Sequence, residues 1–324
     1  MGPRRKVGKT NGCKLFLQLL VLIKFSSAVV SYLMIEFQKQ FKRSLDKIEG
    51  GDSRILEISR VQGGSINSSF RIRTNHSLYF AKLNHLSEYP KMFELESSGL
   101  SFLQRHSPFN MPEPLIADND DQYQWFIMTY INSAAKTEDF WESFGRSLAK
   151  MHRATSADHG LDHNNYIGTL IQRNKKIDKW HDFFRENRIL PLLKIAESKG
   201  VLDNRLRHQF DILLDNVENF FPAERPSALH GDLWSGNYMI DNRGAATIFD
   251  PAVYYGHREM DIGMTKLFGG FDQKFYNSYN EDFPLESGWE ERIEVANLYP
   301  LLVHLILFGR HYLGQIEATL RRFT

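Results

Sequence analysis

Cysteine is almost absent from this chain of 324 residues, in which Cys13 is the only one. A disulfide needs two cysteines, so none can form within the chain, and the composition fits a reducing compartment. The twelve histidines show no zinc-ligand spacing, and the H-E-x-x-H pattern of zinc proteases does not occur. The sequence therefore gives no sign of a disulfide scaffold or of a zinc site.

A surplus of positive charge is missing as well, because the formal net charge is only +1. Six of the 40 basic residues lie in residues 1–33, which contain no acid, and the other 34 stand against 39 acidic residues. The body of the chain is therefore mildly acidic. It lacks the basic footprint of a nucleic-acid-binding protein, and we expect no nucleic-acid partner.

The apolar run near the N-terminus is too short to be a clean membrane span. Leu15 to Ile23 is mostly apolar, follows a basic start, and is separated by Lys24 from a second apolar stretch. This outline resembles a signal peptide with a poor cleavage site. Three alternatives stay open for residues 1–33: an export signal, a membrane-associating extension, and a misassigned start ahead of Met34. We exclude this extension from the fold and expect membrane association only if it is translated and retained.

The remaining composition is that of a globular protein, with 42% hydrophobic and 24% charged residues. The length suffices for a two-lobed unit with an ample buried core. We find neither an internal repeat nor a low-complexity tract.

The first part of the body has the pattern of strands around one helix. Alternating residue types predict strands over 55–61 and 70–74, and residues 78–83 are predicted as a third strand. The apolar spacing predicts a helix from Phe93 to Arg105, and a further strand is predicted from Trp125 to Ile131.

From Glu138 the pattern becomes helical, with apolar residues every three or four positions between Phe140 and Met151. Further helices are predicted over 177–198, 204–220 and 289–322. We expect Pro300 to kink or break the last of these stretches.

The most informative motif is the segment Leu229 to Tyr238, which reads Leu-His-Gly-Asp-Leu-Trp-Ser-Gly-Asn-Tyr. Asp232 and Asn237 lie five residues apart on this glycine-rich turn, and Asp250 follows an apolar strand thirteen residues later. Phosphoryl transfer from ATP needs such a set, because one carboxylate accepts a hydroxyl proton while an amide oxygen and a second carboxylate hold magnesium. The spacing matches the kinase pattern H-x-D-x-x-x-x-N, with Gly231 where protein kinases carry Arg.

This motif resembles the catalytic loop of the fructosamine (ketosamine) kinases, within the aminoglycoside-phosphotransferase-like branch of the kinase fold. Trp234 and Ser235 narrow the resemblance to the fructosamine kinases. Residues 255–261 with 268–271, and residues 308–310, are similar to the same family.

The resemblance implies an α+β, bilobal protein-kinase-like fold. A small β-rich N-lobe with one key helix, residues 34–131, would bind ATP. A larger and mostly helical C-lobe, residues 132–324, would carry catalysis and the substrate.

Asp232 is our candidate catalytic base, which would orient and deprotonate a sugar hydroxyl. Taken alone, an acid beside glycine in a turn is more often a cap, so the spacing to Asn237 and Asp250 carries this hypothesis. Asn237 and Asp250 are expected to bind Mg²⁺, which prefers oxygen ligands and bridges phosphates. Pro251 departs from the Asp-Phe-Gly of protein kinases, but Asp-Pro resembles the fructosamine kinase form. The expected cofactors are ATP and Mg²⁺.

Lys82, near the end of the third predicted strand, is assigned to the α- and β-phosphates of ATP, with Glu96 as its ion-pair partner. A lysine ending a strand is ordinarily solvated, but the gap of fourteen residues to a glutamate on the following helix favours the functional interpretation. Glu94 competes for the partner role from another helix face. The resemblance favours Glu96.

The turn that contains Gly63, Gly64, Ser65 and Asn67 is expected to cover the phosphates, because glycines let backbone amides approach anionic oxygens. The signal is weak alone, since two glycines between strands more often form only a hairpin. The resembling family often has Cys at the position of Ser65, which puts a redox switch through this loop in doubt. The adenine is expected against the strand and linker around Met128 and Tyr130.

Trp234 and His304 are the candidate substrate contacts. Trp234 could stack on the substrate or belong to the core. His304 lies on an apolar helical stretch, where a lone histidine is usually a satisfied core residue, but the resemblance implies a place in the pocket. Asp261 is expected to brace the catalytic loop, to cap a helix, or both, and His230 is expected to be structural in that loop.

The resemblance implies ATP-dependent phosphorylation of the 3-hydroxyl of ketosamines, such as fructosamine or ribulosamine adducts, in deglycation. The rivals are a kinase for another small alcohol such as an aminoglycoside, choline or homoserine, an inactive nucleotide-binding scaffold, and a membrane-tethered protein. We expect a cytoplasmic location, because ATP is available there. The pocket is expected to be built from helices at 165–190 and 300–312. The choice among ketosamines and the oligomeric state stay open.

Overall fold

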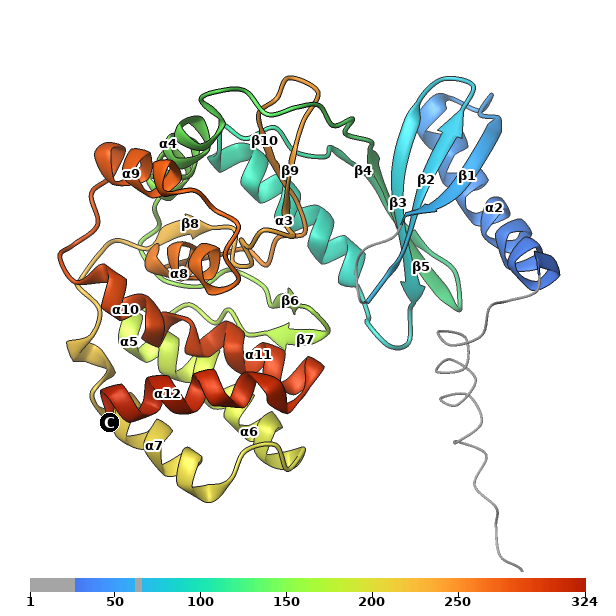
Figure 1. Cartoon of the computed structure of the whole chain (residues 1–324). Helices are drawn as coiled ribbons and strands as arrows, with labels where there is room; N and C mark the ends of the chain where they lie inside the picture. The colour runs from blue at the N-terminus through green and yellow to red at the C-terminus, as the bar shows by residue number, and fades with distance from the viewer. Residues whose placement is uncertain (1–26, 62–65) are drawn as a thin grey trace, which may run out of the picture. The chain divides into compact units, whose positions relative to one another are not determined.

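The structure is a computed structural model that describes residues 27–61 and 66–324. Its backbone contacts divide the chain into two compact units (Figure 1). Unit 1 comprises the chain up to Ser59 together with Ile72–Ser77, and unit 2 comprises Arg60–Arg71 together with Leu78–Thr324. Each unit is described by itself.

Unit 1 is built around a helix that the sequence did not predict, α2 (Ser27–Glu49). The helix continues without interruption past Met34, and its residues Phe41 and Leu45 are fully buried. At its C-terminal end, Thr74 Oγ1 donates a hydrogen bond to Glu49 Oε1 at 2.6 Å. Within the described part of the chain, no helix combines the length and apolar character that crossing a bilayer requires.

The strands that follow include the three that the sequence predicted, β1 (Ile55–Val61), β2 (Ser68–Thr74) and β3 (Leu78–His85). Two further strands, β4 (Pro114–Asn119) and β5 (Tyr123–Thr129), complete a sheet with the order β1-β2-β3-β5-β4. β5 pairs antiparallel with both β3 and β4. The prediction of β5 was correct in type but placed two residues late.

The helix that follows β3 is α3 (Met92–His106), one residue longer at each end than predicted. It contacts β4 and β5 of the sheet, and its buried residues include Phe93 and Leu100. Lys82 pairs with Phe126 in the β3–β5 register, which fixes the position of the lysine relative to the sheet. The predicted order of strands, one helix and further strands is confirmed.

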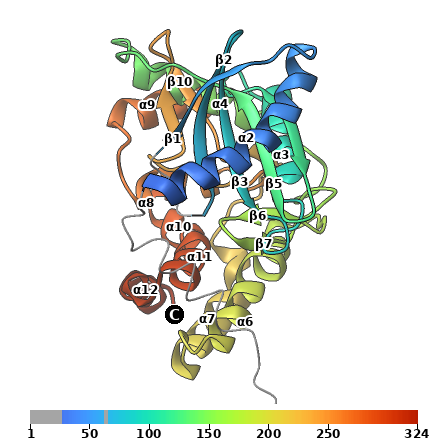
Figure 2. The same cartoon turned by 90° about the vertical axis from the view of Figure 1, so that its right-hand side faces the viewer.

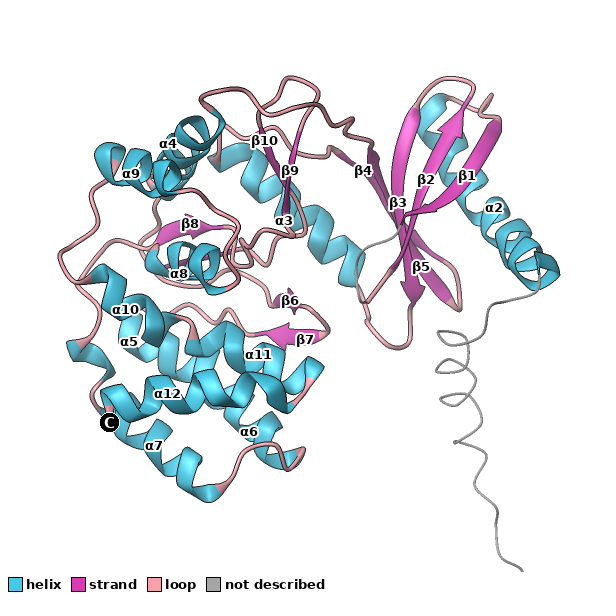
Figure 3. Cartoon of the chain, in the orientation of Figure 1, coloured by secondary structure: helices cyan, strands magenta, loops and turns pink. Residues whose placement is uncertain are grey.

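After residue 138 the chain is mainly helical, as Figure 3 shows by colour. The helix α4 (Phe140–His152) packs against α9 (Gln273–Asp282) at very short range. A Cβ atom at Gly145 would lie 2.2 Å from the carbonyl oxygen of Phe275, so no larger residue fits there. The helix α8 (Glu259–Leu267) packs against α10 (Trp289–Ala296), and side-chain contacts join it to α4 through His152 and to α9 through Tyr276.

A second helical group surrounds α11 (Leu298–Phe308), which lies beside α12 (Leu313–Phe323) in Figures 1 and 2. Pro300 lies in the first turn of α11, where a missing N–H removes no helical hydrogen bond. The stretch is broken as predicted, but at Asn297 and not at Pro300, so the predicted position of the break is wrong. The other members of the group are α5 (Trp180–Phe183), the π-helix η1 (Phe184–Ile189), α6 (Leu190–Ser198), α7 (Asn204–Asp215), and the 3₁₀ turns η2 (Val217–Asn219) and η3 (Arg310–Tyr312).

Of the three-residue strands in unit 2, only the apolar strand before Asp250 was predicted, because three residues are too few to show a period. The expected helix at 165–190 is wrong in its first part, which is a hairpin of β6 (Asn165–Ile167) and β7 (Leu170–Gln172). Two further antiparallel pairs frame the catalytic motif. They are β8 (Ser227–Leu229) with β11 (Tyr254–Gly256), and β9 (Tyr238–Ile240) with β10 (Ala246–Ile248).

Candidate active site

The loop between β8 and β9 carries the histidine, the acid and the amide of the motif, and it lies in unit 2. Gly231 has a left-handed backbone with φ of 81°. A Cβ atom there would approach the carbonyl oxygen of Ala252 to 2.0 Å. This contact explains why glycine stands where protein kinases have arginine: the loop lies directly against the segment that follows Asp250.

The carboxylate of Asp261 holds the backbone of this loop through hydrogen bonds. Its Oδ2 accepts a hydrogen bond from the backbone N–H of His230 at 2.8 Å, and its Oδ1 accepts one from Gly231 N–H at 2.9 Å. Its Oδ2 also lies 3.2 Å from His152 Nε2. Asp261 is the third residue of α8 and not its N-cap, which is Arg258, so the capping alternative is wrong and the bracing geometry is present.

His230 is fully buried, and its Nε2 lies 3.0 Å from the carbonyl oxygen of Phe249. This contact ties the loop to the residue directly before Asp250. Burial lowers the pKa of His230 despite the neighbouring Asp261 and Asp250. A neutral ring in this place suits the structural role that the sequence suggested.

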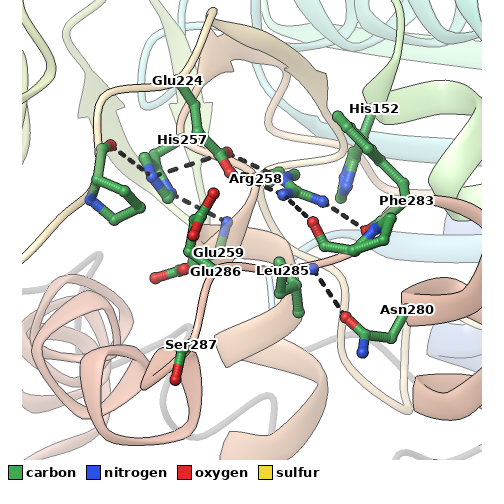
Figure 4. A network of polar contacts seen from close by, with 12 residues as sticks. His152, Glu224, His257, Arg258, Glu259, Asn280, Phe283, Leu285, Glu286 and Ser287 are labelled. Carbon is green, nitrogen blue, oxygen red and sulfur yellow. Dashed lines mark hydrogen bonds and ion pairs between the residues drawn. The ribbon is translucent and has the colours of Figure 1, made fainter.

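The N-terminal end of α8 is itself held by buried ion pairs (Figure 4). Arg258 donates to both carboxylate oxygens of Glu224, at 2.7 Å and 2.9 Å. It also donates to the carbonyl oxygens of Phe283, at 2.7 Å, and Pro284, at 2.6 Å. Because Arg258 is only 3% exposed, this arrangement anchors the helix that carries Asp261.

Asp232 and Asn237 lie in direct contact. Asn237 Nδ2 donates to the backbone oxygen of Asp232 at 2.8 Å and to its Oδ2 at 3.0 Å. Burial raises the pKa of Asp232 to about 7, and the charges of Asp250 and Asp261 act in the same direction while Asn237 opposes them. A carboxylate with a pKa near neutrality suits proton transfer at physiological pH.

Lys82 lies between two acids. Its Nζ donates to Glu96 Oε1 at 2.7 Å and also to Asp250 Oδ1. Burial disfavours the charge on Lys82, but Asp250 and Glu96 outweigh it and raise the pKa of the lysine. Glu94 is exposed, so Glu96 occupies the partner position as the sequence argument favoured.

Asp250 has a left-handed backbone with φ of 55°, which is uncommon for a residue other than glycine. Its side chain is 43% exposed and meets Lys82. The region described contains no group of three or more His, Cys, Asp or Glu side chains suited to a metal ion. The oxygens of Asn237 and Asp250 nevertheless fit Mg²⁺, which binds one or two carboxylates and completes its shell with phosphates and water.

These side chains face one cavity of about 540 Å³ in unit 2. Most of the predicted site residues line it, namely Asn67, Lys82, Glu96, Asp232, Trp234, Asn237, Asp250 and His304. Met128 and Tyr130 do not line it, and the Met128 side chain is only 2% exposed within the hydrophobic core. Gly63, Gly64 and Ser65 lie outside the described residues.

One end of the cavity is aromatic. The ring of Trp234 lies 5.8 Å from that of Phe268, which lies 4.8 Å from the ring of His304. The ring of Tyr312 is 5.0 Å from that of His304 and 6.5 Å from that of Phe268. Tyr312 falls within the expected pocket range 300–312, whereas Phe268 was missed as a lining residue although it stood in one of the blocks that resembled the family.

His304 is not simply a core residue. Its ring Nδ1 lies 2.8 Å from the carbonyl oxygen of Pro300 on the same helix, and burial lowers its pKa. The ring therefore has one nitrogen engaged with the helix while it lines the cavity. His304 is therefore partly buried and bonded like a core residue, and it also lines the cavity like a pocket residue.

Comparison with known proteins gives a consistent picture. A family model described as fructosamine kinase matches residues 37–324. A curated protein of Vibrio parahaemolyticus that carries the name ketoamine kinase is 37% identical over 273 residues, which are 83% of this chain and 93% of its own length. A chloroplastic protein-ribulosamine 3-kinase of Arabidopsis thaliana is 35% identical over 269 residues, which are 82% of this chain and 81% of its own.

Solved structures agree in fold. A crystal structure from Haemophilus somnus, described as a fructosamine-3-kinase, has a TM-score of 0.80 at 27% identity and covers 87% of this chain and 96% of that one. An aminoglycoside phosphotransferase crystallised with AMP-PNP and hygromycin B has a TM-score of 0.58 at 14% identity, over 86% of this chain and 97% of that one. The second likeness shows the fold alone, which is α+β and protein-kinase-like, as the sequence predicted.

Proposed function

This chain belongs to the fructosamine kinase family, and from that membership we propose that it transfers the γ-phosphoryl group of ATP to a hydroxyl of a ketosamine. The observation that carries the proposal is the convergence of Asp232, Asn237, Asp250 and Lys82 on one cavity. Two acids, an amide and a lysine in this arrangement supply the groups that phosphoryl transfer from ATP requires.

Asp232 acts as the base in this proposal. Its carboxylate accepts the proton of the attacking sugar hydroxyl, and the hydroxyl oxygen then bonds to the γ-phosphorus as the bond to the β-phosphate oxygen breaks. Asn237 fixes the carboxylate through its 3.0 Å hydrogen bond. Asp261 keeps the loop backbone still, so that the oxygen of Asp232 stays directed toward the substrate.

Lys82 binds the α- and β-phosphates and Glu96 orients the lysine. Asn237 and Asp250 would hold Mg²⁺, which when bound neutralises charge on the phosphates. Asn67, which also lines the cavity, is the described member of the turn proposed to cover the phosphates. We retain residues 34–131 as the ATP-binding part and 132–324 as the catalytic and substrate-binding part.

The aromatic end of the cavity receives the ketosamine. Trp234 offers a flat apolar face beside Asp232, and His304 has a ring nitrogen available for a sugar hydroxyl. We propose the 3-hydroxyl as the acceptor, in keeping with the 3-kinase names of the relatives. A cytoplasmic role in deglycation follows from this chemistry and from the need for ATP.

The test is an assay with radiolabelled ATP and Mg²⁺ against fructosamine and ribulosamine adducts, on free amines and on protein. Aminoglycosides, choline and homoserine serve as the competing acceptors. We expect turnover with at least one ketosamine, and Asp232→Asn should lose on the order of 10²-fold or more in turnover while it still binds ADP. Turnover confined to a competing alcohol would overturn the proposed substrate, and an unchanged rate in Asp232→Asn would remove Asp232 from the mechanism.

A further inference from the structure

Two amide side chains from the β6–β7 hairpin hold the backbone that follows Asp250. Asn165 Nδ2 donates to the carbonyl oxygen of Val253 at 2.9 Å. Gln172 Nε2 donates to the carbonyl oxygen of Ala252, also at 2.9 Å. Asn165 is 5% exposed and Gln172 is 1% exposed, so both bonds are shielded from water. The hairpin therefore fixes the chain two and three residues beyond Asp250.

The orientation of these amides is set by a directed series of hydrogen bonds. The Nη2 of Arg188 donates to Asn174 Oδ1 at 2.9 Å, and Asn174 Nδ2 donates to Asn165 Oδ1 at 2.9 Å. Because a guanidinium group can only donate, Asn174 must turn its NH₂ toward Asn165, and Asn165 must turn its own toward Val253. The whole series thus directs donors at the segment after Asp250.

A second series of hydrogen bonds sets the orientation of the Gln172 side-chain amide. The hydroxyl of Tyr299 donates to Gln172 Oε1 at 2.7 Å. The NH₂ of Gln172 therefore faces Asn165 Oδ1, at 2.8 Å, and the Ala252 carbonyl. Every polar atom of the two amide side chains is engaged, which gives a buried network a single arrangement.

Arg188 is unusual as the origin of such a series. Its side chain is fully buried, and none of the ion pairs among the described residues includes it. Its guanidinium lies 3.8 Å from the ring centroid of Tyr254 and donates to the carbonyl oxygen of Arg173. Burying a charge without a counter-ion is costly, and a π-helix, which often marks a functional site, carries the residue. This energetic cost indicates that Arg188 has a role other than packing in the core.

Asp250 has a left-handed backbone, and such a strained conformation persists only when the surrounding structure stabilises it. We propose that Asn165 and Gln172 are positioning residues for Asp250, oriented by Arg188 and Tyr299. They hold the backbone after Asp250 so that its carboxylate faces the cavity beside Lys82. This inference rests on the proposed role of Asp250 as a magnesium ligand, and it adds positioning residues from a hairpin whose residues Asn165, Tyr166 and Ile167 also line the cavity.

The test compares the double variant Gln172→Leu, Tyr299→Phe with the wild type. Removing both polar partners leaves the Ala252 carbonyl unpaired, while Asn165 Oδ1 loses its bond from Gln172 but keeps the one from Asn174. Thr265→Val, Tyr276→Phe is the control, because it removes buried side-chain hydrogen bonds elsewhere in unit 2, one from Thr265 Oγ1 to the carbonyl oxygen of Ile262 at 2.7 Å and one between Thr265 and Tyr276 at 3.2 Å. Calorimetry measures ADP binding with Mg²⁺ and with EDTA for all three proteins.

We expect the double variant to bind ADP about tenfold more weakly than the wild type when Mg²⁺ is present, and equally well in EDTA. The Mg²⁺ concentration for half-maximal activity should rise by a similar factor, with the KM for the ketosamine unchanged. The control should match the wild type in both binding measurements. Equal losses with and without Mg²⁺, or no loss in either, would refute the positioning role.

Tyr299→Phe alone gives a second measurement if the double variant does not fold. It frees Gln172 Oε1 and should weaken ADP binding with Mg²⁺ in the same selective manner, by about threefold. An effect of this variant in EDTA as well would also refute the role. Because ADP binding needs no sugar substrate, these outcomes stay separate from a failure of the proposed reaction, which would show as absent ketosamine turnover in the wild type.

Discussion

Asp232 illustrates how its surroundings give a common residue a special chemistry. Burial and two nearby acids raise its pKa to about 7, from an ordinary value of 3.8. The same side chain must be ionised to accept a proton. The environment that makes Asp232 a stronger base therefore also limits the pH range in which it can act.

Activity should accordingly depend on pH through this residue. Below its pKa Asp232 is protonated and inactive as a base, so kcat/KM should rise about tenfold per pH unit up to about pH 7 and then level off. A pH–rate profile with a ketosamine substrate measures this limb. A plateau that extends unchanged down to about pH 5 would assign the proton transfer to another group.

The contribution of Asp232 to the stability of the fold should fall as the pH rises, over the range in which activity increases. Since the fold raises the pKa of Asp232, it favours the protonated acid, and the cost of ionisation grows as pH rises from 3.8 toward 7. Asp232→Asn removes that cost. Its Tm should exceed that of the wild type above pH 7, and the difference should shrink as pH falls toward 4. Thermal unfolding across this range checks the sign, and a constant difference would contradict it.

The acids, the amide and the lysine that face the cavity could be predicted from sequence because the proposed chemistry requires fixed spacings along the chain. Asp232, Asn237 and Asp250 follow the kinase pattern, and Lys82 with Glu96 follows from a strand and the next helix. Met128 failed to reach the cavity because a position on a strand does not reveal which face its side chain takes.

At the scale of elements, α8 matters because it carries Asp261 and rests on buried charge. Arg258 is 3% exposed and Glu224 has a side chain 17% exposed, so their ion pair is largely removed from water. Loss of one partner leaves the other buried and unpaired. The rigidity of the catalytic loop thus depends on a contact remote from the cavity.

Arg258→Met should therefore destabilise the protein by about 3–5 kcal/mol. Arg205→Met is the control, because Arg205 meets Glu317 on the surface at 2.8 Å and should change stability by at most about 1 kcal/mol. Urea unfolding measures both variants. Similar, small changes in the two would show that burial gives the Arg258 pair no special weight.

Sequence reasoning succeeded for elements with several periods and failed for short ones. β1 and β2 each have seven residues with alternating residue types and α3 has four turns, which is enough for a pattern to appear. The β6–β7 hairpin has three residues in each strand, so its apolar residues were taken for part of a helix. Its amide network depends on partners such as Tyr299, which lies 127 positions from Gln172 in the chain.

At the scale of the whole molecule, the start of the folded chain can be tested directly. The buried residues described in α2, including Phe41 and Leu45, lie after Met34, as does Glu49 with its bond to Thr74. A protein that comprises residues 34–324 should therefore retain the Tm and the kinase activity of the complete chain. Side-by-side thermal unfolding and activity assays measure this, and a lower Tm would show that residues before Met34 stabilise the fold.

The position of Trp234 gives the molecule an internal optical reporter. Among its five tryptophans, all of which the structure describes, Trp234 is the one that lines the cavity. A sugar that stacks on its indole displaces water from the ring and alters its fluorescence emission. Occupancy of the site can therefore be followed by light without any label, with Trp234→Phe to identify the source of the signal.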